Sequence, residues 1–270
     1  MPDNLLYNQG MDIQPWTSYP EVNAALLRIL SASQQALREN LIGMILHGSL
    51  ASGDFDPQCS DVAFLVVTAQ PVTPDQMEQL SIAFEQITHS GQPWSTNVEG
   101  SFIPLDALRR YDPPNIYHPA LRCDGSFGVD GHGTDWILQR WNIREYGTAP
   151  YGPEPKTLID PISADEMRKA SAGILFDWWQ PMLEDDFRLD DAEYQAYAVM
   201  TMCRSFYTLK TAEVASKPTA ARYALSVLDT RWHPLIEEAM QWRHGITMDR
   251  KELVKDFIRF TLDFCTEIVG

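Results

Sequence analysis

Apolar positions in the first third of the chain follow two different periods. Between Pro20 and Asn40 the apolar residues recur at helical spacing, which predicts an amphipathic helix. Two continuous apolar runs follow, at 41–46 and 61–67, and each fits a buried strand. The segment between them is rich in Gly, Ser, Asp and Pro, as expected of a loop. The predicted order is therefore helix, strand, loop, strand.

The pattern continues with a second helix and a third strand. Thr73 and Gln76 form a capping box with a proline between them, which predicts a helix over about 74–88. Alternating residues at 96–104 are typical of a strand. Several prolines and glycines at 111–134 predict an irregular excursion.

The middle of the chain is harder to interpret. The segment 134–147 fits a strand and a helix equally well. The segment after it, 148–162, is so rich in proline that we expect neither, and we place a domain boundary there.

Everything beyond about residue 160 reads as helical. A second capping box, Ser163 with Glu166, precedes an apolar stripe. Further helices are expected at about 190–214, 219–228, 234–243 and 249–268. The expected fold is an α/β mixed-sheet domain over residues 1–157 followed by an all-α helical bundle domain over 158–270.

The composition limits the kinds of molecule that this protein is expected to bind. The formal net charge of -16 argues against a nucleic-acid partner, since such binding needs clustered Lys and Arg, and it favours a cationic small molecule. An acidic surface that only maintains solubility explains the charge equally well. We find neither a membrane-spanning stretch nor a secretory signal at the N-terminus, so we expect a cytoplasmic protein without a membrane partner. We also expect a monomer. The four cysteines, Cys59, Cys123, Cys203 and Cys265, are scattered and read as free thiols.

The residues with a chemical signature lie at 47–64, HGSLASGDFDPQCSDVAF. A Gly-Ser turn after one strand lets backbone N–H groups and a hydroxyl approach triphosphate oxygens, while carboxylates on a neighbouring strand hold magnesium against them. Two carboxylates at alternate strand positions would share one face, and a third from another strand would complete the site. Taken alone, the Gly-Ser pair also fits an ordinary turn.

These residues resemble the signature of the polymerase-beta-type nucleotidyltransferases, Gly-Ser followed by Ser-Asp-x-Asp. The matching positions are Gly48, Ser49, Ser60 and Asp61, with Glu99 on a later strand. The resemblance implies nucleotide binding by Gly48, Ser49 and Ser60, and metal binding by Asp61 and Glu99. It also implies Mg²⁺ as cofactor and ATP as co-substrate, with Glu99 as catalytic base.

A second block, residues 203–225, resembles the helical domain of the streptomycin and spectinomycin adenylyltransferases. In that family an Arg and a Lys contact ATP phosphates, which implies this role for Arg204 and Lys217. Without the resemblance, each reads more simply as a surface ion-pair residue.

The chain departs from the signature at Ala63, where the pattern requires the second metal-binding carboxylate. Alanine offers no ligand oxygen, so metal binding should be impaired. Either the protein is an inactive relative, or an aspartate was replaced to trap a substrate complex. We favour the second interpretation because Ser49, Asp61, Glu99, Arg204 and Lys217 all remain.

The acceptor side is altered as well. The resemblance places acceptor contacts at Asp190, Tyr194 and Tyr197, where two tyrosines replace the family's histidine and acidic residues. The Trp178–Trp179 pair reads as core. The expected function is transfer of AMP to a hydroxyl of an aminoglycoside-like antibiotic, in a form impaired at Ala63. A degenerate protein that only binds a nucleotide or small molecule, and a nucleotidyltransferase acting on a different acceptor, stay open.

Overall fold

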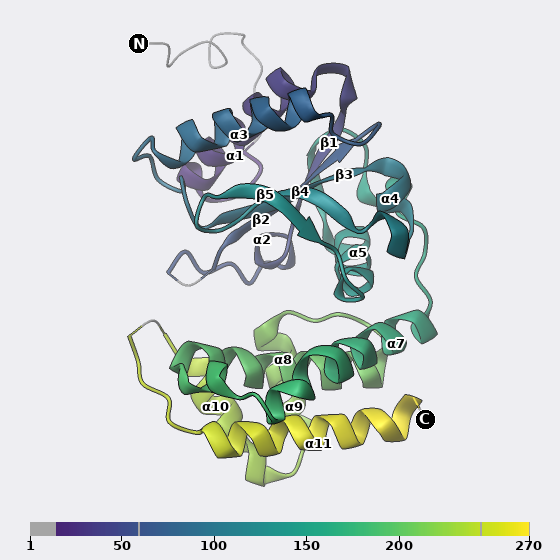
Figure 1. The fold of residues 1–270 in the computed structure, drawn as a ribbon. Coiled ribbons are helices and arrows are strands. Elements are labelled where there is room, and N and C mark those ends of the chain that lie inside the picture. Colours follow the sequence, from purple (N-terminus) through teal and green to yellow (C-terminus); the bar gives the residue numbers. More distant parts are fainter. Residues whose placement is uncertain (1–14, 59, 244, 270) are drawn as a thin grey trace.

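The computed structural model describes residues 15–58, 60–243 and 245–269. A six-stranded sheet with its helices is followed by a separate group of helices (Figure 1). The strand order is β5-β4-β3-β2-β1-β6, with β2 and β3 parallel and every other pair antiparallel. The sheet is therefore mixed, as predicted. Its strands are β1 Leu41–His47, β2 Val62–Thr68, β3 Val98–Pro104, β4 Tyr117–Leu121, β5 Phe127–Gly131 and β6 Thr148–Tyr151.

Helices cover both faces of the sheet. Figure 1 shows α1 (Pro20–Leu37) and α3 (Pro74–Thr88) on the face away from the helical group. On β2, Phe64 packs into the apolar cluster under these two helices, whereas Leu65 packs into a cluster on the opposite face. Because both faces of β2 are buried, its sequence is a continuous apolar run without alternation. The other helices of this region are α2 Ser49–Ser52, α4 Leu105–Arg109, α5 Asp135–Tyr146 and α6 Pro155–Leu158.

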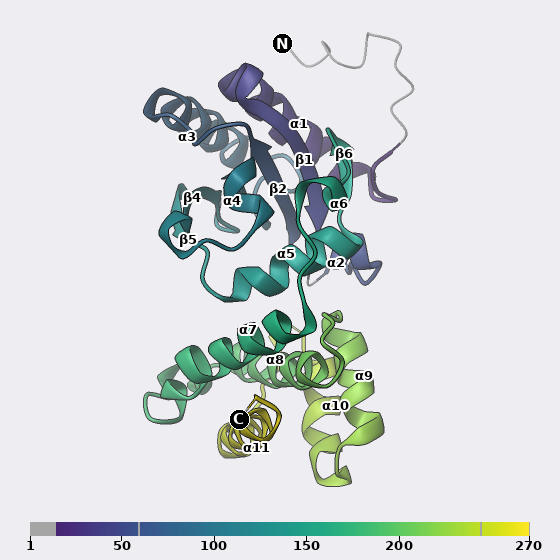
Figure 2. The ribbon, with the colours of Figure 1, turned by 90° about the vertical axis from the view of Figure 1, so that its right-hand side faces the viewer.

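The second half of the chain is helical and has one apolar core of its own. Both predicted capping boxes are present, at Thr73 with Gln76 and at Ser163 with Glu166. The helical region, as we call it below, consists of α7 Ala164–Ile174, a π-helical turn Leu175–Trp179, α8 Ala192–Thr211, α9 Lys217–Val227, α10 His233–Gln241 and α11 Lys251–Val269. Figure 2 shows this region stacked beneath the α5 side of the sheet.

Two predictions from the proline content are wrong. The segment 111–134 contains the hairpin β4–β5 rather than an irregular excursion, and 148–162 contains β6 and α6. Pro119 is tolerated because the pairing of β4 with β3 is confined to Leu121 and Ala120. Pro150 is tolerated because β6 lies at the edge of the sheet. The ambiguous segment 134–147 forms helix α5.

Among the described residues, no helix is both long and apolar enough to cross a membrane. The N-terminal segment 1–14, for which a secretory signal was not expected, lies outside the described residues, as does Cys59.

Candidate functional site

The Gly-Ser turn lies next to position 63. Gly48 follows β1 with φ of 67°, a conformation that L side chains rarely adopt. A Cβ placed on Gly48 would lie 3.4 Å from the Cβ of Ala63, so the turn is in close contact with β2. Ser49 begins the short helix α2. The hydroxyl of Ser60 accepts a hydrogen bond from the Asp56 amide at 3.0 Å, which ties back the loop before β2.

The predicted carboxylate positions share one end of the sheet. Asp61 directly precedes β2, and the parallel register places Ala63 beside Glu99 of β3. Since alternate residues of a strand share a face, Asp61, Ala63 and Glu99 lie together, as the motif predicted. Ala63 itself is buried and brings no oxygen.

A third side chain that sequence reasoning missed completes this cluster. The thiol of Cys123, in the turn between β4 and β5, lies 3.8 Å from Asp61 Oδ2 and 3.6 Å from Glu99 Oε2. One ligand atom of each residue lies within 4.8 Å of the other two. We call Asp61, Glu99 and Cys123 the sheet-edge cluster. A lone cysteine in a segment predicted to be irregular gave no signal of this position.

The surroundings of the sheet-edge cluster shift its ionisation. Partial removal from water raises the pKa of Glu99, and the charge of Asp61 raises it further, while the charge of Lys217 opposes the shift. Burial and the nearby Glu99 raise the pKa of the Cys123 thiol to about 12. Burial lowers the pKa of His47, at the end of β1, to about 4, so this imidazole is neutral at pH 7. Because Lys217 begins α9, its effect on Glu99 places the helical region within electrostatic reach of the cluster.

These donors do not fit the magnesium site that the sequence resemblance implies. Mg²⁺ prefers a near-octahedral shell of oxygen ligands, and a thiol is a poor partner for it. The carboxylate required at position 63 is missing, and the neighbouring donor is the sulfur of Cys123.

A cavity of about 660 Å³ separates the sheet-bearing region from the helical region. Its walls include α5, the π-helical turn and α8. Tyr197 and Arg204, both predicted from sequence, line it. Burial lowers the pKa of Arg204, and the Lys217 ammonium lies 5.4 Å from the ring centre of Tyr197. The other lining residues relevant to binding are Tyr111, Asp135, Asp177, Trp178 and Trp179.

The other two predicted acceptor residues lie differently. Tyr194 packs behind Tyr197, with ring centres 5.5 Å apart, and its hydroxyl accepts a hydrogen bond from Trp178 Nε1 at 3.2 Å. Asp190 does not line the cavity and instead forms an ion pair with Lys251 of α11 at 2.7 Å.

The two tryptophans of the π-helical turn divide their roles. Trp179 is buried, as predicted, but Trp178 is 49% exposed and faces the cavity, so the prediction that both belong to the core is wrong for Trp178. Both residues lie in the π-helical turn, a feature that frequently occurs at functional sites. Sequence reasoning also missed Asp135 and Asp177, which line the same cavity.

Comparison with known proteins agrees with this arrangement. Residues 157–265 match the family model for the aminoglycoside adenylyltransferase C-terminal domain. An aminoglycoside (3'') (9) adenylyltransferase of Escherichia coli is 24% identical over 93% of this chain and 97% of its own length. A spectinomycin 9-adenylyltransferase of Campylobacter jejuni is 24% identical over 84% of this chain and 88% of its own. A crystal structure of spectinomycin adenyltransferase AAD(9) from Enterococcus faecialis with ATP and spectinomycin aligns with a TM-score of 0.68 and 16% identity, covering 90% of this chain and 98% of that one.

The fold and the relatives together define a nucleotidyltransferase. Within this class, the resemblance to the aminoglycoside adenylyltransferase family is confirmed over nearly the whole chain.

Proposed function

We propose that this protein transfers AMP from ATP to a hydroxyl of a cationic, aminoglycoside-like antibiotic and thereby confers resistance. The observation that carries the proposal is that Lys217 connects the cavity with the sheet-edge cluster, whose own residues do not line the cavity: its ammonium lies 5.4 Å from the ring centre of Tyr197 in the cavity wall. Lys217 of α9 influences the ionisation of Glu99 on β3. Arg204 of α8 lines the cavity that separates the two halves. We also propose a cytoplasmic location, because ATP, the proposed co-substrate, is supplied there.

Each polar group has a distinct role in this proposal. Arg204 and Lys217 bind triphosphate oxygens, Arg204 through a planar guanidinium and Lys217 as a point charge. Glu99 accepts the proton of the attacking hydroxyl, because its raised pKa makes it a better base than an ordinary glutamate. The Gly48–Ser49 turn brings backbone N–H groups to the same edge of the sheet.

The cavity suits a cationic acceptor. Its volume of about 660 Å³ is typical of sites for small organic ligands. Asp135 and Asp177 face it from opposite sides and would pair with ammonium groups, while Tyr111, Trp178 and Tyr197 provide flat surfaces for sugar rings. The names of the relatives point to acceptors of this kind.

Transfer by the chain with Ala63 should be slow, because the position that pairs with Glu99 lacks its carboxylate. The same absence is the observation that favours a protein that binds nucleotide without chemistry.

The test is an acceptor panel of streptomycin, spectinomycin and uncharged sugar alcohols, with AMP attachment followed by mass spectrometry over long incubations. We expect AMP on a cationic acceptor only. Asp177→Asn should weaken binding of that acceptor by about 1.5 to 3 kcal/mol, the range for hydrogen bonds to charged groups. Asp165→Asn is the matched control, since Asp165 is exposed on α7 and pairs with Lys169 at 2.8 Å.

Absence of AMP on every acceptor, with ATP bound normally, would leave the binding protein as the better interpretation. Transfer to an uncharged acceptor alone would show that the acidic cavity walls do not select the substrate.

A second prediction concerns the phosphate contacts. Arg204→Ala and Lys217→Ala should each weaken ATP binding by about 1.5 to 3 kcal/mol, because each removes a charged donor from the triphosphate. Calorimetry with a non-hydrolysable ATP analogue measures this. Arg222→Ala, on the exposed side of α9, is the control and should leave affinity unchanged. Parental affinity in both variants would remove Arg204 and Lys217 from the nucleotide site.

A further inference from the structure

The sheet-edge cluster combines two carboxylates with a thiol, which is not the donor set that Mg²⁺ requires. We propose that Asp61, Glu99 and Cys123 form a binding site for a thiophilic divalent cation of the Zn²⁺ class. This site binds such a cation more tightly than it binds Mg²⁺. The proposal goes beyond AMP transfer, because it concerns which ion the protein binds in the absence of any substrate.

Backbone hydrogen bonds hold the three ligands in place. The amide of Val62, next to Asp61, donates to the carbonyl of Asn97 at 3.0 Å. The amide of Asn97 donates in turn to the carbonyl of Cys123 at 2.8 Å. These bonds tie the start of β2, the approach to β3 and the β4–β5 turn side by side. The cluster is therefore positioned by the main chain and does not depend on flexible side chains alone.

The distances between the donor atoms suit a tetrahedral ion. Zn–S and Zn–O bonds of about 2.3 and 2.0 Å at the tetrahedral angle separate sulfur from oxygen by about 3.5 Å. The Cys123 sulfur lies 3.6 Å from Glu99 Oε2 and 3.8 Å from Asp61 Oδ2. A small inward movement of the side chains would complete the geometry. Three protein ligands leave the fourth position open, as in catalytic zinc sites.

The cluster gathers two carboxylates and a thiol around one point, and on Glu99 the charge of Asp61 acts more strongly than the opposing charge of Lys217. A thiol has one proton and can donate it to one carboxylate only, whereas a cation would contact all three groups at once. On binding, the S–H bond of Cys123 breaks, its electron pair forms the metal–sulfur bond, and the proton passes to solvent.

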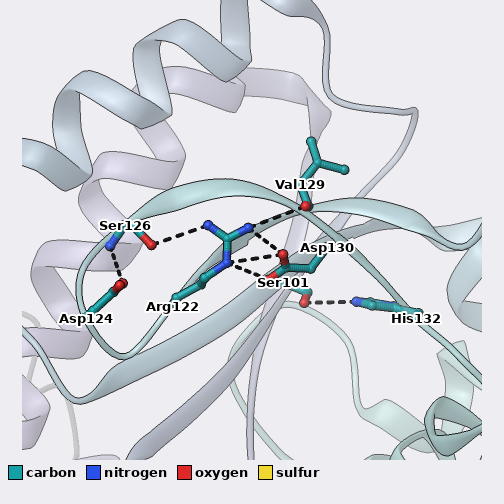
Figure 3. Close-up of polar contacts among 7 residues, drawn as sticks. All are labelled: Ser101, Arg122, Asp124, Ser126, Val129, Asp130 and His132. Atoms are coloured by element: carbon teal, nitrogen blue, oxygen red, sulfur yellow. Dashed lines mark hydrogen bonds and ion pairs between the residues drawn. The ribbon is translucent and has the colours of Figure 1, made fainter.

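The guanidinium of Arg122, the residue before Cys123, does not act as the cation of the sheet-edge cluster. Figure 3 shows Arg122 turned along the β4–β5 hairpin, where its Nε donates to both carboxylate oxygens of Asp130 at 3.1 and 3.2 Å and its Nη2 donates to Oδ1 at 2.5 Å. It also donates to Ser126 at 3.3 Å and to the Val129 carbonyl at 3.4 Å. Its charge is thus committed to the hairpin, although its sequence neighbour is Cys123.

The test is titration of chelator-treated full-length protein with Co²⁺, a spectroscopic substitute for Zn²⁺. We expect a thiolate-to-cobalt charge-transfer absorption, which one equivalent of Zn²⁺ abolishes and a large excess of Mg²⁺ does not. Cys123→Ser should remove the absorption and weaken Zn²⁺ binding by about a hundredfold or more, because loss of residues that only support metal ligands already costs about 10- to 100-fold. Asp124→Asn, a charge change at the neighbouring exposed residue, is the control and should behave as the parent.

Cys123→Asp provides a second variant in case Cys123→Ser is poorly folded. It should keep divalent binding, lose the charge-transfer absorption and gain relative affinity for Mg²⁺. The proposal is overturned if the parent shows no such absorption, if Cys123→Ser retains it, or if Mg²⁺ displaces Co²⁺ as readily as Zn²⁺ does. No ATP or acceptor is present in these titrations, so their failure leaves the AMP-transfer proposal standing, and the failure of transfer leaves the metal site standing.

Discussion

Replacement of Ala63 by aspartate is expected to raise Mg²⁺-dependent AMP transfer by about a hundredfold or more. The new carboxylate would lie beside Glu99 in the β2–β3 register and on the face of Asp61, next to the Gly48 turn. A bound ion that neutralises phosphate charge contributes several kcal/mol to transition-state stabilisation, and each 1.36 kcal/mol is tenfold in rate. Initial rates of pyrophosphate release across Mg²⁺ concentrations, for Ala63→Asp and the parent, measure the effect.

Ala63→Asn is the matched control. It has nearly the same size and shape as Ala63→Asp but no charge, so it should show little gain. An equal gain in both variants would indicate a steric effect at the Gly48 turn. No gain in either would contradict the interpretation of Ala63 as a lost metal ligand and favour the binding protein.

Glu99→Gln, made in the Ala63→Asp background, is expected to lower kcat by about 100- to 10,000-fold while ATP affinity changes little. For the parent chain, in which burial and the charge of Asp61 raise the pKa of Glu99, the same role predicts a pH profile of the slow transfer. A base acts only when deprotonated, so kcat should fall as pH decreases through a value above that of an ordinary glutamate. Lys217→Ala should move this acidic fall in kcat to still higher pH, because the Lys217 charge lowers the pKa of Glu99.

Stopped-flow or steady-state rates from acidic to neutral pH test this, with ATP affinity measured in parallel. Glu99→Asp is a useful companion, since it keeps the carboxylate on a shorter side chain and should retain part of the rate. An unchanged kcat in Glu99→Gln, or an acidic limb that survives the substitution, would remove Glu99 as the base.

The fold was predictable where local signals determine it. The two capping boxes set the starts of α3 and α7 correctly, and the apolar runs located β1 and β2. The strands that were missed depend on partners distant in sequence. β6 pairs with β1 across about a hundred residues, and proline content gives no indication of such pairing.

In the candidate site, too, local sequence predicts some residues, whereas others are brought in by contacts between distant segments. The spacing within 47–64 places Asp61 and position 63 on one face, and the resemblance already implied Glu99, which the parallel pairing of β2 and β3 brings beside them. Cys123 joins them only because the β4–β5 hairpin folds against β3, a contact without a sequence signature. Asp135 and Asp177 likewise meet at the cavity only when the helical region packs under α5.

The spacing of two residues on helix α8 affects how the substrate range can change. Tyr197 and Arg204 both line the cavity and are separated by seven residues, or about 10 Å along the helix axis. Under the proposed roles, α8 fixes the distance between the phosphate contact at Arg204 and the acceptor contact at Tyr197. Substitution of Tyr197 can therefore change the antibiotic that is accepted without moving Arg204. New substrate ranges can therefore evolve in this architecture by single substitutions along α8, with the nucleotide end kept intact.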